Sequence, residues 1–145
     1  MDNEPQKQES HRTSIVPMLA VRNGTKAIEF YKEAFDAEEL WRIGSGESVV
    51  AGLLVCGANF FLADESPPHG TRSPVSVGAT TVRIELFTED PKAVLAKAVA
   101  AGATELGPVI EHQYETKGVR PIKRMLQGAV RDPYGHMWLI GCILD

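Results

Sequence analysis

Arg83 and Glu85 are the two residues of this chain whose types and spacing could do chemistry together. They are separated by one residue, Ile84, in the run VRIELF (82–87), where polar and apolar side chains alternate as in a β-strand. Side chains two positions apart in a strand share a face, so the pair would form a polar handle in an apolar cup. Such a handle could orient a small molecule or serve as acid and base. The alternative is a salt bridge at the rim of a sheet, since buried polar side chains are usually paired for structural reasons.

The four histidines of the chain show no metal-binding pattern. His11 lies in the polar N-terminal stretch, and His69 lies in a proline-rich segment. His112 falls in the polar stretch 111–118, predicted to be a loop, and His136 follows the turn DPYG (132–135). No two histidines have the spacing HxxxH, which would place two imidazoles on one helix face. Each histidine is therefore expected to lie on the surface or in a turn.

A basic cluster, Arg120, Lys123 and Arg124, precedes one of the predicted strands. We interpret it as a solvated edge that discourages pairing with another strand, in preference to an anion site. The sequence contains no P-loop, no GxGxxG and no nucleophile elbow. None of the reactions that depend on those motifs is therefore indicated.

Composition places the chain among ordinary globular proteins. Of its 145 residues, 43% are hydrophobic and 23% are charged, the net charge is -4 and the pI is about 5.6. This balance argues against nucleic acid or an anionic membrane as the main partner, and no apolar run is long enough to span a bilayer. Cys56 and Cys142 lie in apolar runs and are expected to be buried, reduced thiols of a cytoplasmic protein. Residues 1–13 are polar, lack the apolar core of a signal peptide and are predicted to be a disordered tail.

The elements that would position these side chains occur twice. Residues 16–40, VPMLAVRNGTKAIEFYKEAFDAEEL, align without a gap with residues 82–106, VRIELFTEDPKAVLAKAVAAGATEL. The alignment matches Lys26 with Lys92 and Leu40 with Leu106, and each copy predicts a strand, a turn, an amphipathic helix and the start of a second strand. The alternative is chance likeness between two amphipathic helices. Two copies are too few for a solenoid and favour two half-domains about a pseudo-twofold axis.

Hydrophobic periodicity extends this plan to the whole chain. Helices are predicted from Lys26, with Thr25 as cap, and from Pro91, with Asp90 as cap and Gly102 as the stop. The predicted strands share apolar alternation and are 14–21, 38–43, 48–56, 59–63, 80–87, 105–110, 124–131 and 137–143. The order βαβββ–βαβββ indicates an α+β fold with strands in two half-barrels and helices outside. We expect one domain, 14–145, made of repeats 14–64 and 79–145 joined by a polar linker, 64–77.

Strand alternation also divides the side chains between two faces. Ile84 and Leu86 are expected to pack under a helix, which turns Arg83, Glu85 and Phe87 toward the cavity. This assignment requires the strand-to-helix turn to differ by one residue between the repeats. Among the other aromatic residues, Phe61 is expected to face the cavity, and Phe60 and Trp138 to pack under helices; Trp41 has no assigned face.

Three motifs resemble the vicinal oxygen chelate superfamily, the group of glyoxalases, bleomycin resistance proteins and dioxygenases. They are AIEFYKEAFDAEE (27–39), LADESPPHGTRSP (62–74) and VRDPYGHMWLI (130–140), and they most resemble the PhnB-like branch. The resemblance covers nearly everything except the N-terminal tail. It implies paired half-barrels and a homodimer. It does not imply one activity, because the superfamily includes lyases, epimerases, dioxygenases and metal-free drug binders.

Enzymes of this superfamily usually hold one divalent metal, often Zn, Ni, Fe or Mn, with His and Glu from the first and last strand of each repeat. In this sequence those positions fall on Val16, Phe61, Arg83 and Leu139. None of the four is a usual ligand, since a divalent ion needs deprotonated N, O or S donors at about 2 Å. A shift of one residue would supply only Pro17, Leu62, Ile84 and Ile140. The resemblance therefore implies a fold that has lost its metal site, and no cofactor is predicted.

We predict a glyoxalase-like or bleomycin-resistance-like homodimer that binds a small, partly apolar molecule in a metal-free cavity. Arg83 and Glu85 would be its polar handle and the candidates for any catalysis. The predicted lining residues share positions on the cavity faces of the strands and are Val16, Met18, Phe61, Arg83, Glu85, Phe87 and Leu139. No nucleic acid or membrane partner is expected.

Two alternatives stay open from the sequence. The first is an enzyme, a glyoxalase I-like lyase or a related isomerase or dioxygenase, whose metal is held by relocated ligands among Glu85, His69, His112 and Glu47. The second is an interaction module whose cavity is packed shut.

Overall fold

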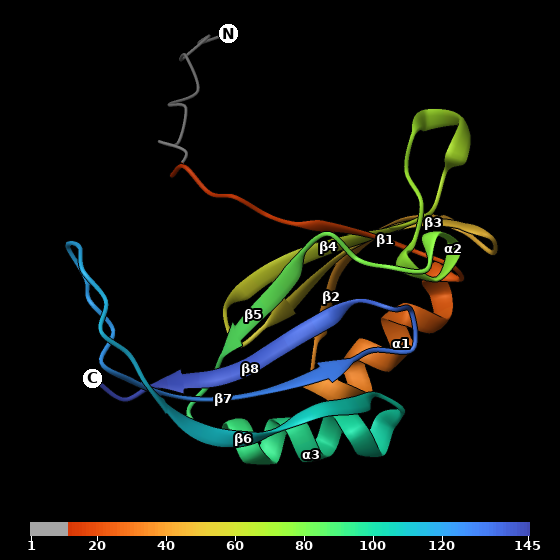
Figure 1. Ribbon diagram of the computed structural model, residues 1–145. Helices are drawn as coiled ribbons and strands as arrows, with labels where there is room; N and C mark the ends of the chain where they lie inside the picture. The colour runs from red at the N-terminus through yellow and green to blue at the C-terminus, as the bar shows by residue number, and fades with distance from the viewer. Residues whose placement is uncertain (1–11) are drawn as a thin grey trace, which may run out of the picture.

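The computed structural model describes residues 12–145 and consists of two four-stranded mixed sheets with helices packed against them (Figure 1). The predicted disordered tail, residues 1–13, lies outside the described residues except for Arg12 and Thr13, which are exposed and form no helix or strand.

The two halves of the chain repeat one plan, as the sequence predicted. In the first half the order is β1 (Met18–Val21), α1 (Gly24–Phe35), β2 (Glu38–Ser45), β3 (Ser48–Val55) and β4 (Ala58–Asp64). In the second half it is β5 (Arg83–Phe87), α3 (Pro91–Ala101), β6 (Thr104–Gln113), β7 (Arg124–Arg131) and β8 (Met137–Ile143). The sheets have the orders β1-β4-β3-β2 and β5-β8-β7-β6, each with one parallel pair, β1 with β4 and β5 with β8. This is the predicted βαβββ duplication and confirms the α+β class.

The first strand and the first helix begin at other residues than predicted, for reasons that lie in the backbone hydrogen bonds. β1 begins at Met18 rather than at Ser14. Pro17 has no N–H to donate to a strand partner, although its carbonyl accepts a 2.8 Å hydrogen bond from the N–H of Phe61. Helix α1 begins before Thr25, because Asn23 is its cap: the Asn23 side chain accepts from the N–H of Lys26 at 3.2 Å with φ of 63°. Asparagine tolerates this left-handed conformation better than most residues.

The turns after the first strands differ in length between the halves. Two residues, Arg22 and Asn23, separate β1 from α1, whereas three residues, 88–90, separate β5 from α3. This confirms the one-residue difference that the sequence assignment required. Ile84 and Leu86 pack against the core, as expected from alternation, and Phe87 is 49% exposed.

The linker between the halves contains two short helices that the sequence analysis did not predict. They are a short 3-10 helix, η1 (Pro67–His69), and a short α-helix, α2 (Pro74–Val77). Ser73 caps α2 by accepting from the N–H of Ser76 at 3.3 Å, and proline follows at the first helical position.

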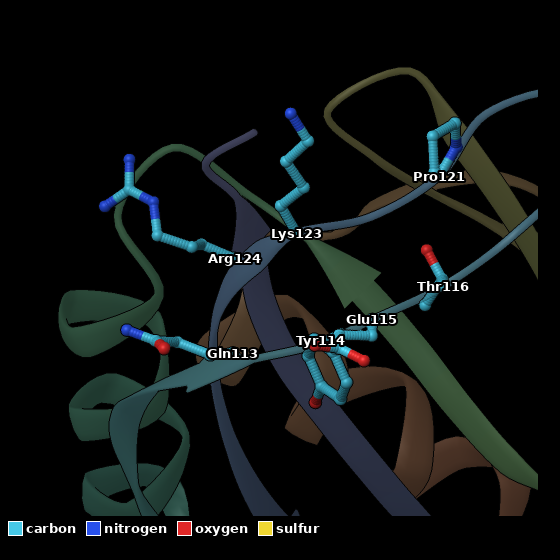
Figure 2. Close-up of a pocket in the computed structure, with 7 residues that line it drawn as sticks. All are labelled: Gln113, Tyr114, Glu115, Thr116, Pro121, Lys123 and Arg124. Atoms are coloured by element: carbon cyan, nitrogen blue, oxygen red, sulfur yellow. The ribbon is translucent and has the colours of Figure 1, made fainter.

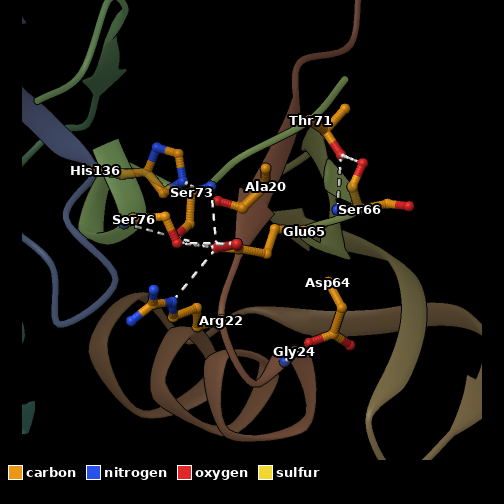
Figure 3. Close-up of polar contacts among 10 residues, drawn as sticks. All are labelled: Ala20, Arg22, Gly24, Asp64, Glu65, Ser66, Thr71, Ser73, Ser76 and His136. Carbon is orange, nitrogen blue, oxygen red and sulfur yellow. Dashed lines mark hydrogen bonds and ion pairs between the residues drawn. The ribbon is translucent and has the colours of Figure 1, made fainter. Parts of the chain in front are cut away.

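Glu65 fastens this linker to the first sheet (Figure 3). Its carboxylate accepts from the hydroxyl of Ser73 at 2.7 Å and from the hydroxyl of Ser76, and lies 3.5 Å from the guanidinium of Arg22. The Ser76 and Ser73 hydrogen bonds lower the pKa of Glu65 to about 2, because they favour the charged form.

A buried polar cluster, which we call the Asp132 clamp, joins the two halves. Asp132 accepts from the Tyr31 hydroxyl of α1 and from the Trp138 indole N–H at 2.9 Å. It also accepts from the backbone N–H groups of Tyr134 and His136 at 2.8 and 3.0 Å. Burial and the nearby Asp132 carboxylate raise the pKa of Tyr31 well above its ordinary value. The motif predicted to be a turn therefore also connects the second repeat to the first.

His136 adds a second connection at the same place. Its Nε2 lies 2.8 Å from the carbonyl oxygen of Ala20 on β1, so the ring donates to the first sheet from the β7–β8 turn (Figure 3). Around this polar cluster the core is apolar, with Phe60 and Trp138 5% and 2% exposed, as the alternation of their strands predicted. Helices α1 and α3 also contact one another directly.

Two local expectations were wrong. Cys56 is exposed, because it lies in the β3–β4 turn with φ of 47° rather than inside a strand, and Cys142 is half-buried. β6 runs to Gln113, which puts His112 in a strand and not in a loop. Among the helices of residues 12–145, none has the length and apolar character needed to cross a membrane.

Candidate functional site

Each sheet has one face turned away from its helix, α1 in the first half and α3 in the second, and we call this its free face. On the first sheet one row of paired positions runs Met18, Phe61, Gly52, Trp41 from β1 to β2. Paired positions of neighbouring strands share a face. Their neighbours on the other face, such as Leu62 and Leu53 in the adjacent positions, are fully buried. The row Met18–Trp41 therefore lies on the free face.

Trp41 and Phe61 form an aromatic platform on this free face. Their rings meet edge to face, with centroids 4.9 Å apart and planes at 70°. The indole lies over Gly52, where an added Cβ would come within 2.5 Å of it. Met18 and Trp41 are 56% and 36% exposed, so the platform is open to a ligand or a second protein surface.

The remaining predicted residue of the first half, Val16, lies just before β1 and is half-buried. The residue aligned with Phe61 in the parallel pair β1–β4 is Met18 and not Val16.

The free face of the second sheet carries the predicted charged residues. Glu85 aligns with Leu139 of β8 and, through it, with Ala129 of β7, while Arg83 aligns with Met137. Arg83 and Glu85 are both exposed, and Leu139 is half-buried. Within residues 12–145 Arg83 makes no ion pair, so the salt bridge considered for Arg83 and Glu85 is not formed.

Glu85 instead has an uncharged partner on β7. The amide Nε2 of Gln127 donates to Glu85 Oε1 at 2.6 Å. Strand β8 lies between the two residues, and the position of β8 aligned with Gln127 is Gly141. A Cβ at Gly141 would lie 2.4 Å from the carbonyl oxygen of Leu126, so this position requires glycine.

A hollow lies next to this pair on the second sheet. Its volume is about 230 Å³, and it is lined mostly by apolar residues and by one histidine: Leu106, Gly107, Pro108, Ile110, His112, Gln127, Gly128, Ala129 and Leu139. The Nε2 of His112 lies 3.3 Å from the backbone oxygen of Gln127 and donates to it. In a neutral imidazole this leaves Nδ1 as an acceptor.

The predicted site residues do not line a single cavity within one chain. Leu139 lines the hollow of the second sheet, whereas Met18 lines a groove of about 560 Å³ between β1 and β5. Phe87 lines a third space, a groove of about 540 Å³ between the end of α1 and the start of α3.

The donor set does not fit a divalent metal. The four positions implied by the resemblance carry valine, phenylalanine, arginine and leucine, which offer no suitable donor. Among the described residues, no group of three or more His, Cys, Asp or Glu side chains is arranged to hold a metal ion. Of the relocated candidates, His69 is 2.7 Å from the Ser66 hydroxyl in the linker, and Glu47 is exposed in the β2–β3 turn. Glu85 and His112 both contact Gln127.

A larger hollow lies elsewhere, in the β6–β7 connection (Figure 2). It measures about 780 Å³ and is lined by residues from both arms of that connection: Gln113, Tyr114, Glu115, Thr116, Pro121, Lys123 and Arg124. Arg124 of the basic cluster is already paired with Asp145 at 2.9 Å and with Glu111 at 3.3 Å. None of the predicted site residues lines this hollow.

Sequence reasoning did not find Gln127. Its contact with Glu85 joins positions 42 residues apart across an intervening strand, which alternation in a single strand cannot reveal. The sequence gives only a weak indication of its role. Gln127, Ala129 and Arg131 share one face of β7, and Gln127 is the polar residue of that face nearest to the middle of the strand.

Comparison with known proteins bears on the family. The model of the Glyoxalase/Bleomycin resistance protein/Dioxygenase superfamily matches residues 13–140. An uncharacterized protein of Mycobacterium tuberculosis is 34% identical over 133 residues, which cover 88% of this chain and 73% of that protein. An uncharacterized Arabidopsis thaliana protein is 32% identical over 127 residues, covering 78% of this chain and 68% of that protein.

Solved structures agree with the family match. The X-ray structure of the Arabidopsis thaliana protein superposes with a TM-score of 0.63 at 30% identity and covers 89% of this chain and 98% of its own. TioX from Micromonospora sp. ML1 has the same fold, with a TM-score of 0.66 at 22% identity over 92% of this chain and 100% of TioX. The chain therefore belongs to the Glyoxalase/Bleomycin resistance protein/Dioxygenase superfamily.

Proposed function

We propose that this protein binds a small, partly apolar molecule on the free faces of its sheets and that binding requires no metal. The observation that carries the proposal is the aromatic platform of Trp41 and Phe61, continued by Met18. Large aromatic and thioether side chains that stay partly exposed on one face of a sheet suit an apolar ligand, because covering them removes apolar area from water. The arrangement places several such side chains together without a charged residue among them.

We further propose that a second copy of the chain completes the cavity. Apolar side chains are strongly exposed on the free faces, with Ile43 at 65%, Ile110 at 52% and Ile143 at 46%. Soluble monomers rarely expose large contiguous apolar patches, and a twofold dimer would cover these faces on both copies at once. This pairing would also bring together hollows that are separate in one chain. A tightly packed dimer without room for a ligand is the interaction-module alternative.

The protein's two tryptophans allow a direct test of binding. Trp41 lies on the platform and Trp138 is 2% exposed in the core. A ligand on the free face is expected to change Trp41 emission and leave Trp138 unchanged. A panel of small aromatic and aliphatic compounds would be titrated into the native protein and into Trp41→Phe, with thermal stability measured in parallel. Saturable changes in the native protein that disappear in Trp41→Phe would support the proposal; a panel that neither shifts emission nor raises stability would contradict it.

The metal-dependent alternative is tested separately. Of the four relocated candidates, Glu85 and His112 both contact Gln127, so this pair on the second sheet is the one to test. Elemental analysis of purified protein is expected to give no stoichiometric zinc, nickel, iron or manganese, and ligand binding is expected to survive chelation. Recovery of one metal per chain, lost in Glu85→Gln, would favour a lyase, isomerase or dioxygenase instead.

We also propose that the protein belongs to the PhnB-like branch of the superfamily and that it is cytoplasmic. The PhnB-like branch rests on the motifs at 27–39, 62–74 and 130–140. A cytoplasmic location rests on the ordinary composition and on the two cysteines, which are free in the described structure.

A further inference from the structure

The two free faces, alike in topology, differ in charge. In the paired rows of the first sheet the free-face positions carry Met18, Phe61, Gly52 and Trp41, and the next row along carries Ala20, Ala63, Val50 and Ile43. None of these side chains is ionisable; a carboxylate, Glu38, occurs on this face outside these two rows, beside Leu54 at the start of β2. The second sheet carries a carboxylate, Glu85, at the position that aligns with Leu139 near the middle of its face. A ligand that contacts the middle rows of both faces would therefore meet apolar side chains on the first sheet and a carboxylate on the second.

The Glu85 carboxylate is oriented but not neutralised. Its Oε1 accepts from Gln127, and within residues 12–145 it forms no ion pair and no second hydrogen bond. An amide beside a carboxylate must present its NH₂ group to it, which turns the Gln127 carbonyl oxygen away as a free acceptor. Gln127 thus holds Glu85 in one place while leaving its charge and its second oxygen available.

The surroundings favour donors over acceptors in the ligand. The free oxygen of Glu85 and the amide oxygen of Gln127 are both acceptors. His112 adds a third when its ring is neutral, because its Nε2 hydrogen is used by the Gln127 backbone oxygen. Arg83 and Arg131 are the opposing groups, one row away on either side of Met137 on the same face, and they would attract an anion instead.

We propose that the second free face recognises a protonated amine or amidinium group of the ligand, with Glu85 as the ion-pair partner and Gln127 as the residue that positions it. The cation donates to the free oxygen of Glu85 and to the amide oxygen of Gln127, and the apolar part of the ligand lies in the hollow beside Leu139 and Ile110. Charge-assisted hydrogen bonds of this kind are stronger than neutral ones. The inference rests on the proposed function, since it names the class of ligand that the same cavity takes.

Three compounds test the proposed cation site: 4-phenylbutylamine, 4-phenylbutan-1-ol and 4-phenylbutanoate. They share a phenyl group on an alkyl chain and differ in the polar group at its end. Their affinities for the full chain would be measured by calorimetry or by ligand-observed NMR at low ionic strength, because salt screens exposed charges. The amine is expected to bind roughly tenfold more tightly than the alcohol, which corresponds to one charge-assisted hydrogen bond, and the carboxylate more weakly than both.

Variants assign the effect to a residue. Glu85→Gln removes the charge with little change of shape and is expected to bring the amine down to the affinity of the alcohol, which itself stays unchanged. Gln127→Leu keeps the carboxylate but frees its orientation, so the amine should lose affinity roughly two- to fivefold while keeping its preference over the alcohol. The matched control is Glu33→Gln, the same substitution on an exposed residue of α1 that makes no ion pair in residues 12–145, and it should change nothing. Far-ultraviolet circular dichroism confirms that each variant is folded.

The outcomes separate this inference from the proposed function. Equal binding of amine and alcohol, or an amine preference that survives Glu85→Gln, would overturn the cation site and leave apolar binding standing. Preferred binding of 4-phenylbutanoate would overturn it in favour of an anion site at Arg83 and Arg131. Failure of all three probes and of the wider panel to bind would contradict the proposed function, and the inference with it.

Discussion

The hydroxyl of Tyr31 donates to the carboxylate of Asp132, a contact between residues 101 positions apart that ties α1 of the first repeat to the β7–β8 turn of the second. Asp132 is 3% exposed and Tyr31 is fully buried. A buried carboxylate is costly unless donors surround it, and here two side chains and two backbone N–H groups do so. The duplicated halves are therefore joined by a satisfied charge as well as by apolar packing.

Removing one donor of the Asp132 clamp should destabilise the whole chain. Tyr31→Phe leaves the carboxylate buried with one partner fewer and is expected to lower the free energy of unfolding by about 1–3 kcal/mol. Urea denaturation measures this change. The control is Tyr134→Phe, because the Tyr134 hydroxyl makes no hydrogen bond within residues 12–145 and is only half-buried; its effect should stay below about 0.5 kcal/mol. Equal losses in the two variants would contradict the clamp.

The same tyrosine gives an alkaline dependence. Burial and Asp132 raise the pKa of Tyr31 above its ordinary value of 10.0, so the folded state favours the protonated hydroxyl. The stabilisation is complete below that ordinary value and is lost as the pH rises above it, when the unfolded chain ionises first. Between neutral and alkaline pH the native protein should lose more stability than Tyr31→Phe. Parallel curves for the two proteins would show that Tyr31 ionisation is not linked to folding.

Glu65 should contribute an acid dependence of opposite sign. Its pKa is lowered from 4.5 to about 2 by the hydroxyls of Ser76 and Ser73, so the folded state favours the carboxylate. Its stabilisation is present above pH 4.5 and is lost as the pH falls toward 2. Glu65→Gln should be less stable than the native protein at neutral pH, and the difference should shrink over this acid range. Urea midpoints across the range measure it. Glu38→Gln, an exposed residue without an ion pair in the described chain, should track the native protein.

The substitution Gly52→Ala tests the aromatic platform without changing either of its aromatic residues. In Gly52→Ala the new methyl would lie 2.5 Å from the indole of Trp41, so the ring must leave the sheet. We expect red-shifted tryptophan emission and several-fold weaker binding of an aromatic ligand, because the contact area is lost. Gly107→Ala, whose added methyl has nothing within 4 Å, is the control for tryptophan emission and not for affinity, because Gly107 lines the hollow of the second sheet. Unchanged emission and affinity in Gly52→Ala would show that Trp41 does not form the floor of the site.

Dimer formation can be tested on the outer strand of the first sheet. Ile43→Lys places a charge on an apolar side chain that is 65% exposed in the single chain. If a second copy covers this face, the substitution acts on both copies and should raise the dissociation constant at least about tenfold. Light scattering after size exclusion, over a range of concentrations, measures the change. Val119→Lys, at a residue 99% exposed in the β6–β7 connection, is the control. A native protein that stays monomeric at high concentration would refute the dimer.

Sequence periodicity was sufficient for the fold because it concerns contacts within and between neighbouring elements. The βαβββ order, the helix-packed positions of Phe60 and Trp138, and the one-residue difference between turns all follow from alternation and helix spacing. The starts of β1 and α1 differ from the predicted ones because individual residues, and not the hydrophobic pattern, determine them. Pro17 delayed β1, and Asn23, not Thr25, capped α1. Helix α2 was missed, although Ser73 followed by Pro74 is a start signal that was present in the sequence.

The functional site was less accessible to sequence reasoning. Strand parity placed Arg83 and Glu85 on one face but could not say what faces them. The residues beside them come from β7 and β8, and the contact between Gln127 and Glu85 crosses β8. The distribution of Met18, Phe87 and Leu139 over different hollows depends on how the two repeats dock, which no local pattern encodes.

The unlike free faces have a consequence for how any bound molecule would lie. A duplicated scaffold with equivalent halves would accept a ligand in either of two directions, related by the internal symmetry of the fold. With aromatic rings on the first half and the Glu85–Gln127 pair on the second, those two directions differ in free energy. The sequence difference between the two repeats would therefore favour one of the two binding orientations of an elongated ligand over the other.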